Sequence, residues 1–526
     1  MATLFIRNLA VVIIISFFSS LYLSVPSLAS SDGFVHCLLQ KIPDELVLTQ
    51  SSSSFTDVLV SSIHNPRFVN NATARPLCIV TPTDASHVQA AVRCGRAEGI
   101  HLRARSGGHD YEGLSYRSAR DGEVFAVVDL GARLRAVSVS VDDATAWVES
   151  GATLGELYYA VAKTSPVLAF PAGVCPTVGV GGHFSGGGIS IMSRKYGLSV
   201  DNILDAKLVN AHGELVDRAA MGEDHFWAIR GGGGESFGVV VSWKIRLVEV
   251  PPTVAVFAIV KTVDEGAADV ISRWQHVTPR LPNELSIRVK VRGQRATFQS
   301  LYLGPCASLV PIMSSIFPEL GMTSADCREM SWLDSVAFIQ FMDLTTPVEA
   351  LLNRTTSLST YTKAKSDYVR RAIPKDVWKS IFSWFAMNGS DQMLLEPMGG
   401  FMDGVPAAAT PYPHRAGVLY NIQYITFWFG DDTAAVANRW INDLYAFMEP
   451  YVTSNPREAY VNFRDLDIGE NAVSNDGVST FESGKVWGEK YFAGNFERLA
   501  AVKAAVDRTD YFRNEQSIPP LPVEIK

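Results

Sequence analysis

A glycine-rich stretch at residues 170–198 constrains this chain more than any other feature of its sequence. Its centre, from Cys175 to Gly188, reads Cys-Pro-Thr-Val-Gly-Val-Gly-Gly-His-Phe-Ser-Gly-Gly-Gly. Glycine offers little side-chain packing, but it lets bare main-chain N–H groups approach a flat or anionic molecule. We therefore interpret this stretch as a cradle for a cofactor.

A second glycine loop lies upstream and carries one histidine. It reads Arg-Ser-Gly-Gly-His-Asp-Tyr over residues 105–111, so that His109 and Cys175 are the two reactive side chains of the two loops. Neither the long stretch nor the glycine run at residues 231–234 is a Rossmann phosphate loop. The third glycine of that motif is replaced by Phe184 in the long stretch and by Ser236 in the glycine run at residues 231–234.

The N-terminus is typical of a secretory signal. An apolar run at residues 9–25 follows Arg7 and precedes small residues, which predicts a signal segment at 1–30. A signal anchor is the alternative, but the run is short for a membrane span. Three glycosylation sequons fit the secretory route, at Asn71, Asn353 and Asn388. We expect an extracellular or cell-wall protein without a membrane anchor, with the vacuole as an alternative destination.

Size, charge and cysteine content narrow the class further. The 526 residues predict two or three packed units, and the net charge of −8 argues against nucleic acid as a partner. Six cysteines are too few for a disulfide scaffold in a chain of this length. We expect Cys37 and Cys94 to pair and leave the state of Cys306 and Cys327 open. No metal site is expected.

The order of predicted elements indicates an α+β protein. A strand–helix–strand unit is expected at residues 77–80, 85–98 and 100–103, and a hairpin is expected from strands at 203–210 and 215–218. After Pro251 and Pro252 the strands become longer, which predicts an antiparallel sheet with helices on one side. The expected boundaries are 31–250 for the first domain, 251–459 for the second and 460–526 for a C-terminal segment that packs back on the first.

Three motifs together resemble the berberine bridge enzyme-like family. They are the His109 loop, the Cys175 loop and the run Tyr-Phe-Arg-Asn-Glu-Gln-Ser-Ile-Pro-Pro at residues 511–520. The resemblance spans essentially the whole mature chain. It implies a vanillyl-alcohol oxidase type fold, with an FAD-binding domain in two subdomains, a substrate domain and a C-terminal segment returning to the FAD domain.

The resemblance also implies an FAD attached twice, through His109 to its 8α-methyl carbon and through Cys175 to ring carbon C6. His183 is similar to a family histidine near the N1–C2 edge of the flavin, although it could simply support the loop. Val178 occupies the position that gates oxygen in the family, and valine there implies an oxidase producing hydrogen peroxide; a buried core valine is the alternative. The remaining expected cofactor-binding residues are Arg105, Ser106, Gly107, Gly108, Gly179, Gly181, Gly182, Gly238 and Val240.

The substrate side departs from the family pattern. Phe463 stands where members usually have a tyrosine base, and Asn421 stands where they have a charged partner. A further active-site tyrosine is replaced by Ile189, whereas Tyr111 and Gln423 match. We expect a more apolar pocket that suits a less polar substrate than a sugar. Tyr111, or a water held by Gln423 and Asn421, would assist the reaction.

The resulting hypothesis is a secreted, monomeric FAD-linked oxidoreductase. It would transfer a hydride from an alcohol or comparable C–H donor to flavin N5, with oxygen as acceptor and a sugar, an allylic aromatic alcohol or an alkaloid as substrate. The first alternative is a flavin-binding protein that has lost alcohol oxidation. The second is a serine hydrolase, from Gly-Glu-Ser-Phe-Gly at residues 234–238, which the β-branched run after the serine disfavours because a helix should follow.

Overall fold

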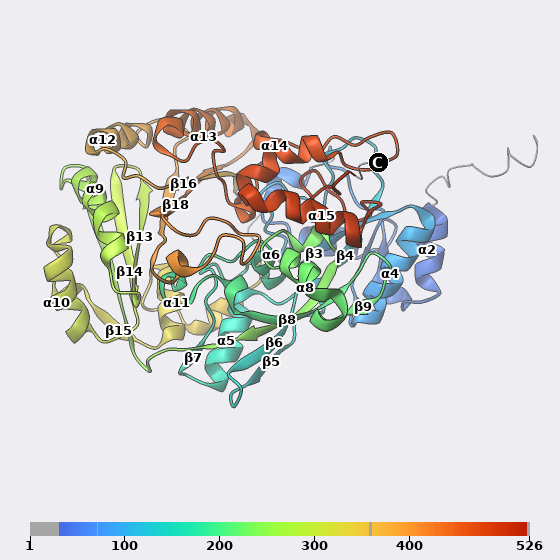
Figure 1. The fold of residues 1–526 in the computed structure, drawn as a ribbon, viewed down its shortest axis with the longest axis horizontal. Helices are drawn as coiled ribbons and strands as arrows, with labels where there is room; N and C mark the ends of the chain where they lie inside the picture. Colours follow the sequence, from blue (N-terminus) through green and yellow to red (C-terminus); the bar gives the residue numbers. More distant parts are fainter. Residues whose placement is uncertain (1–30, 71, 357–359, 523–526) are drawn as a thin grey trace, which may run out of the picture.

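The computed structural model of the protein describes residues 31–70, 72–356 and 360–522 (Figure 1). The predicted signal segment at residues 1–30 and the sequon at Asn71 lie outside this part of the chain. Within the described ranges, no helix is both long enough and apolar enough to cross a membrane.

The first sheet contains the strand–helix–strand unit that the sequence predicts. Its strand order is β1-β2-β4-β3, and β2 and β3 both run parallel to β4. The strands are β1 (Val47–Thr49), β2 (Cys78–Val80), β4 (Phe125–Asp129) and β3 (His101–Arg105). The predicted helix is confirmed as α4 (Ala85–Glu98), which Asp84 caps by accepting the N–H of Ser86 and which ends at left-handed Gly99, φ 71°.

The second sheet is antiparallel and has the order β5-β6-β10-β8-β9. Its strands are β5 (Val137–Ser140), β6 (Thr145–Glu149), β10 (Val239–Arg246), β8 (Ile203–Val209) and β9 (Leu215–Val216). The predicted hairpin is confirmed by the antiparallel pairing of β8 with β9. A two-stranded ribbon of β7 (Leu168–Ala169) and β11 (Val248–Glu249) extends from this unit.

The helices around the second sheet include α5 (Leu154–Thr164), α6 (Val180–Ser185), α7 (Ser193–Tyr196) and α8 (Arg218–Ile229). Two of them, α6 and α7, are short and lie within the long glycine stretch. A capping box starts α5, because the Thr153 hydroxyl accepts the N–H of Glu156 while the Glu156 carboxylate accepts the N–H of Thr153. The capping box thereby fixes the first residue of α5. The strand β7 follows the end of α5 and leads to Cys175.

The third sheet has seven strands, all antiparallel, in the order β15-β12-β14-β13-β17-β18-β16. The strands are β15 (Arg328–Met330), β12 (Val254–Thr262), β14 (Arg295–Tyr302), β13 (Leu285–Arg292), β17 (Gln392–Pro397), β18 (Tyr420–Trp428) and β16 (Tyr361–Val369). One face is covered by the helices α9 (Ala267–Val277), α10 (Cys306–Ile316), α12 (Lys375–Trp384) and α13 (Ala434–Met448) (Figure 1). The predicted antiparallel sheet with helices on one side is therefore confirmed.

Alternation along the strands decides which residues face the helices. In β13, Leu285, Ile287 and Val289 belong to the core beneath the helices, whereas Arg288 and Lys290 point to the opposite face. That opposite face turns toward the first two sheets. The helix α11 (Trp332–Phe341) lies on this side and packs into the core that it shares with α5.

The C-terminal segment returns to the first two sheets. Its helices α14 (Phe481–Phe492) and α15 (Phe496–Val506) lie over this part of the molecule (Figure 1). Beyond them, the buried Glu515 carboxylate accepts hydrogen bonds from Arg103 Nη1 of β3 at 3.0 Å and from the main-chain N–H of Ala119 at 2.5 Å. Lys503 of α15, also fully buried, donates to Asp507 Oδ2 and to the carbonyls of Ser236 and Phe512, each at 2.7 Å.

Two disulfides bind helices to their neighbours. The predicted Cys37–Cys94 bond is confirmed and fastens α2 (Ser31–Leu39) to α4. The open question at Cys306 and Cys327 is answered by a second bond between them. Cys78 and Cys175 are the free cysteines of the described chain.

The buried cation of α15 yields a stability prediction. Lys503→Met keeps the length of the side chain but leaves Asp507 and Asp510, which lie 2.7 and 3.1 Å from Nζ, without a cation. We expect a loss of about 3–5 kcal/mol in unfolding free energy, because an unpaired buried charge remains. Urea unfolding measures it, with Lys485→Met as the control. Lys485 lies on α14 with its side chain 47% exposed, and its substitution should change stability by less than about 0.5 kcal/mol. Equal stabilities for the two variants would contradict the argument.

Candidate functional site

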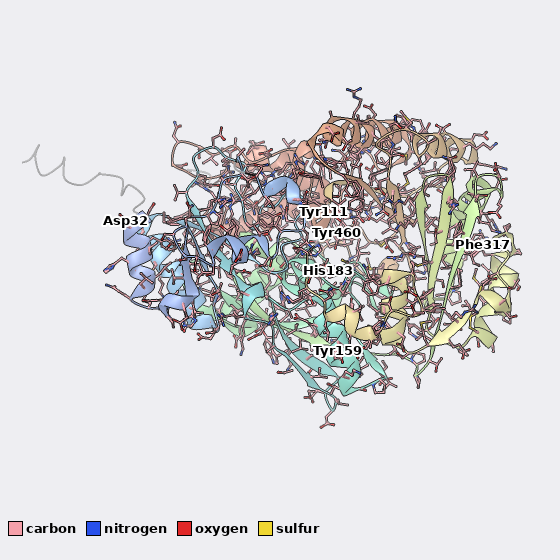
Figure 2. All side chains as sticks on the ribbon, turned by 180° about the vertical axis from the view of Figure 1, so that it is seen from behind. Asp32, Tyr111, Tyr159, His183, Phe317 and Tyr460 are labelled. Carbon is pink, nitrogen blue, oxygen red and sulfur yellow. A yellow bond between two sulfur atoms is a disulfide. The ribbon has the colours of Figure 1, made fainter. Side chains whose placement is uncertain are left out.

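A cavity of about 600 Å³ lies between the two glycine loops and the open face of the seven-stranded sheet. Tyr111, His183 and Tyr460 all line it and lie together at the centre of the molecule in Figure 2. Its volume is that of a typical small-molecule site. Further wall residues come from β3, β13, β14, β17 and β18, from α11 and from the segments at 460–464 and 512–514.

The two glycine loops touch each other through their main chains. A Cβ atom built on Gly107 would lie 2.4 Å from the Gly179 nitrogen, and one built on Gly179 would lie 2.3 Å from the Gly107 nitrogen. Both separations are far below any real Cβ contact, so neither position accepts a side chain without displacing the other loop. This contact brings His109 and Cys175 to one wall of the cavity.

Thr177 joins the two reactive side chains. Its hydroxyl lies 2.8 Å from His109 Nε2 and 3.6 Å from Cys175 Sγ. Thr177 was missed, although its place two residues after Cys175 in the glycine stretch was a signal that could have identified it. The imidazole and the thiol therefore face the cavity from a shared hydrogen-bonded centre.

His64 stacks on His109 and was also missed. The ring centroids are 3.5 Å apart, and His64 Nε2 donates to the Gly107 carbonyl at 3.0 Å. Burial lowers the pKa of His64 to about 4 and holds the pKa of His109 well below its ordinary value, with His64 adding to the effect. Both rings are neutral at neutral pH, so His109 keeps a nitrogen lone pair for reaction.

The expected N–H cradle is only partly available. The N–H groups of Val180 and Gly181 donate to the carbonyls of Ala152 and Ser150, at 2.9 and 3.2 Å, so the expectation of bare N–H groups in the glycine stretch is wrong for these two residues. In the described chain, the N–H groups of Gly107 and Gly108 have no hydrogen-bond acceptor. Ser106, Gly108, Gly182, Gly238 and Val240 all line the cavity as predicted residues of the site.

Arg105 is a structural residue, and its predicted role in cofactor binding is wrong. Its side chain is fully buried away from the cavity wall. It forms an ion pair with Asp129 of β4 at 2.6 Å and donates to the carbonyls of Val58 and Leu59 at 2.8 and 2.6 Å. It thereby fastens β3 and its loop to α3 (Phe55–Val60).

His183 lines the cavity in one defined tautomer. The main-chain N–H of Gly173 donates to Nε2 at 3.0 Å, and burial lowers the pKa of the ring to about 4. A neutral ring whose Nε2 accepts must carry its proton on Nδ1. His183 therefore both supports the loop and keeps one N–H donor.

Tyr111 and Gln423 meet across the cavity. Gln423 Nε2 donates to the Tyr111 hydroxyl oxygen at 2.8 Å, and the Phe463 ring lies edge-on to Tyr111 with centroids 6.3 Å apart. Burial, with a contribution from Cys175, raises the pKa of Tyr111 above its ordinary value. Val178 and Ile189 line the same cavity.

Polar residues of the seven-stranded sheet were missed, and they add hydrogen-bonding groups to the cavity wall. Polar and charged side chains from three neighbouring strands line the wall, namely Arg288, Lys290, Gln299, Gln392 and Glu396. Arg288 Nε donates to Gln299 Oε1 at 2.8 Å and Nη1 donates to Glu396 Oε1 at 3.2 Å. The alternation of apolar with polar residues along 285–292 was the available signal.

Asn421 does not line the cavity, so its expected role in holding a water there is wrong. It is fully buried, and its Nδ2 donates to the Asp367 carbonyl at 3.0 Å. Tyr460, three residues before Phe463, lines the cavity instead. Its hydroxyl oxygen lies 2.9 Å from the Gly188 nitrogen and 2.8 Å from Asn462 Nδ2, and both groups donate to it.

The serine hydrolase alternative does not fit the geometry. Ser236 is buried in a 3-10 turn that leads into the strand β10, and its hydroxyl accepts the main-chain N–H of Ile518 at 3.0 Å. The nearby His225 bonds through Nε2 to the Phe237 carbonyl at 3.1 Å. Ser236 therefore lacks the exposure and the histidine partner that a nucleophile needs.

Comparisons with known proteins agree with this geometry. A family model of the FAD binding domain matches residues 76–218, and one described as berberine and berberine like matches residues 459–519. The berberine bridge enzyme-like protein Cyn d 4 of Cynodon dactylon is 56% identical over 488 residues, 93% of this chain and 93% of that protein.

Solved structures are equally similar. Wild-type Phl p 4.0202, described as a glucose dehydrogenase, is 54% identical with a TM-score of 0.92, and the match covers 93% of this chain and 100% of the other. A Phl p 4 variant in which valine replaces an isoleucine is described as a glucose oxidase. It matches at 54% identity with a TM-score of 0.91 and the same coverage of 93% and 100%.

The contact between the glycine loops yields a second prediction. Gly107→Ala should destabilise the protein by about 1–3 kcal/mol, because its Cβ would force the loops apart. Gly182→Ala is the matched control, since a Cβ there meets nothing within 4 Å. Thermal unfolding of both variants measures the difference. A Gly107→Ala protein as stable as Gly182→Ala would show that the loops do not depend on this contact.

Proposed function

Since the chain belongs to the berberine bridge enzyme-like family of FAD-linked oxidoreductases, with the vanillyl-alcohol oxidase type fold, we propose that it oxidises the hydroxyl group of a sugar-like alcohol. In this proposal the flavin is attached to both His109 and Cys175 and oxygen is the final acceptor. The observation that carries the proposal is the polar sheet wall facing His109 and Cys175 across one cavity.

The residues present fit a doubly attached flavin. A neutral imidazole and a thiol lie on one wall, both hydrogen-bonded to the Thr177 hydroxyl. Gly182 leaves open space where any other residue would place a side chain. The free N–H groups of Gly107 and Gly108 suit an anionic group. These features support His109 and Cys175 as the attachment residues.

The chemistry that FAD supplies when bound is acceptance of a hydride from the substrate. The residues of this chain bind and orient the two reactants. The Nδ1–H of His183 is the donor that we assign to the flavin edge, where it would stabilise negative charge after reduction. Tyr111 keeps its proton because burial raises its pKa, so its hydroxyl donates to the substrate oxygen while Gln423 holds it in place.

A sugar is the substrate class that the wall favours. Two cations and two amides, at Arg288, Lys290, Gln299 and Gln392, offer donors for several hydroxyl groups at once. A wall made for a purely aromatic alcohol would be apolar instead. The description of Phl p 4.0202 as a glucose dehydrogenase supports the same class.

We propose oxygen as the final electron acceptor because of the position and the small side chain of Val178. This side chain lines the cavity three residues after Cys175. The description of the isoleucine-to-valine variant of Phl p 4 as a glucose oxidase supports the idea that a smaller aliphatic side chain admits oxygen in this fold.

Secretion is proposed from the disulfides and the glycosylation sequons. The two disulfides are typical of an oxidising compartment. The sequons at Asn353 and Asn388 lie on exposed side chains that a glycan could reach. Together with the predicted signal at residues 1–30, these features favour an extracellular protein.

The proposed function predicts a flavin spectrum that survives acid precipitation and bleaches anaerobically with sugars. His109→Ala and Cys175→Ala should each keep one attachment, whereas the double variant should release its flavin into the acid supernatant. Visible spectra before and after addition of sugars and aromatic allylic alcohols measure both properties. A firmly attached flavin that nothing bleaches would favour the alternative of a flavin-binding protein, and a colourless protein would contradict the attachment and the oxidation together.

We expect Val178→Leu to change the rates of the two half-reactions to different extents. The larger side chain should slow reoxidation by oxygen at least about tenfold, which corresponds to about 1.4 kcal/mol in the barrier. Reduction by substrate should change little, because Tyr111 and Gln423 stay in place. Stopped-flow spectra of each half-reaction make this comparison, with Ile189→Leu as a control at another aliphatic wall position. Unchanged reoxidation in Val178→Leu would remove Val178 from the oxygen path.

A further inference from the structure

Phe463 leaves the proposed alcohol oxidation without a phenol to accept the proton of the substrate. Tyr111 and Tyr460, which both line the cavity, do not replace it, because burial raises the pKa of each phenol and each therefore holds its proton. His183 does not replace it either, because its one unprotonated nitrogen already accepts the N–H of Gly173. The acceptor must therefore be sought elsewhere on the cavity wall.

Three carboxylates line the cavity within the described chain, at Asp110, Glu235 and Glu396. Asp110 and Glu235 both pair with Arg464, at 2.8 and 2.7 Å. Asp110 also accepts the main-chain N–H of Glu112 at 2.8 Å. These two carboxylates therefore connect the C-terminal segment to the glycine loops, whereas Glu396 alone lies on the sheet.

Glu396 presents one free oxygen to the cavity. Its Oε1 accepts from Arg288 Nη1 at 3.2 Å. Its Oε2 has no hydrogen-bond partner in the described residues, yet it is not among the atoms sealed from solvent. The Arg288 guanidinium is itself fixed by Gln299, and it holds the Glu396 carboxylate through Oε1 only.

The strand register brings Glu396 close to Tyr111 and Gln423. Glu396 of β17 lies opposite Asn421 of β18, and Gln423 is the next residue on the same face of β18. Diagonal neighbours of this kind are roughly 7–8 Å apart. Gln423 holds the Tyr111 hydroxyl, so Tyr111, Gln423 and Glu396 belong to one region of the cavity wall.

We propose that Glu396 is the catalytic proton acceptor of this oxidation, an inference that rests on the proposed function. The substrate C–H bond breaks with its electron pair going to the flavin, and the O–H bond breaks with its proton going to Glu396 Oε2. The C–O single bond becomes a carbonyl. Two electrons thus reduce the flavin, and Glu396 later releases its proton to water in the cavity.

The charges around Glu396 set the expected pH dependence. Burial raises the pKa of its carboxyl, and Arg288 opposes this effect. The other charged neighbour on β13 is Lys290, while Asn421 and Gln423 on β18 are neutral. Tyr368 of β16, at the end of the row, donates its hydroxyl proton to Tyr412. Only the carboxylate form accepts a proton, so flavin reduction should accelerate as pH rises through the raised pKa of Glu396.

Glu396→Gln tests the proposal in the flavin-loaded protein. The rate constant of anaerobic flavin reduction by sugar should fall about 10²–10⁴-fold and lose its rise with pH. Glu396→Asp should recover part of the rate and retain a pH dependence. Asp391→Asn is the matched control, because Asp391 is also buried with a raised pKa and pairs with Arg292 at 3.3 Å, but does not line the cavity. It should retain the wild-type rate and pH profile.

A second readout does not depend on turnover. Infrared difference spectra between low and high pH, recorded without substrate, should contain a carboxyl band that is lost in Glu396→Gln and kept in Asp391→Asn. Its midpoint should coincide with the rise in the wild-type reduction rate. If Glu396→Gln does not fold, the infrared measurement and the Glu396→Asp variant together test whether Glu396 is the proton acceptor.

The possible outcomes distinguish a failure of the proposed oxidation from a failure of the role of Glu396. A wild-type flavin that no alcohol reduces would overturn both the oxidation and the role of Glu396. A reducible wild type with an unchanged rate and pH profile in Glu396→Gln would overturn the role of Glu396 and leave the oxidation standing. The same holds if the infrared band attributed to Glu396 shows no titration within the pH range of the kinetic rise.

Discussion

The contact between Gly107 and Gly179 is the constraint on which the rest of the site depends. Main-chain atoms of two loops meet at a distance that no Cβ atom permits. Only this approach allows a histidine from the loop after β3 and a cysteine from the loop after β7 to reach the same threonine hydroxyl. Glycine in both loops therefore serves to position His109 and Cys175, because the absence of a side chain on each glycine lets the two loops approach each other.

The seven-stranded sheet supplies the opposite wall through simple alternation. Its apolar side is sealed by four helices, so the polar side is free to face the cavity. The C-terminal segment then joins the two walls. Arg464 pairs with Asp110 and Glu235 of the glycine-loop side, while Asp465 binds Lys363 at 3.1 Å and Lys365 at 2.7 Å on β16.

Local patterns made much of the fold predictable from the sequence. The helix at residues 85–98 matches to the residue, because its apolar spacing, its cap and its terminal glycine are all nearby in the chain. The direction of single side chains was not predictable from motifs. Arg105 belongs to a glycine loop yet points into the core, and Asn421 shares a face with Gln423 yet lies behind the wall. His64 and Glu396 were missed because their partners Gly107 and Arg288 come from distant segments, and only the assembled fold shows the pairing.

The buried Glu515 has a consequence for the order in which the protein matures. The carboxylate binds Arg103 of β3, which lies 412 residues earlier in the chain and is therefore synthesised long before Glu515. Phe512, Arg513 and Asn514, just before it, are part of the cavity wall. The first sheet can assemble early in synthesis, but the cavity is complete only after residues 512–514 have been made and folded back. Any covalent attachment inside the cavity is then a late event, and a chain that stopped before Phe512 would lack this part of the wall.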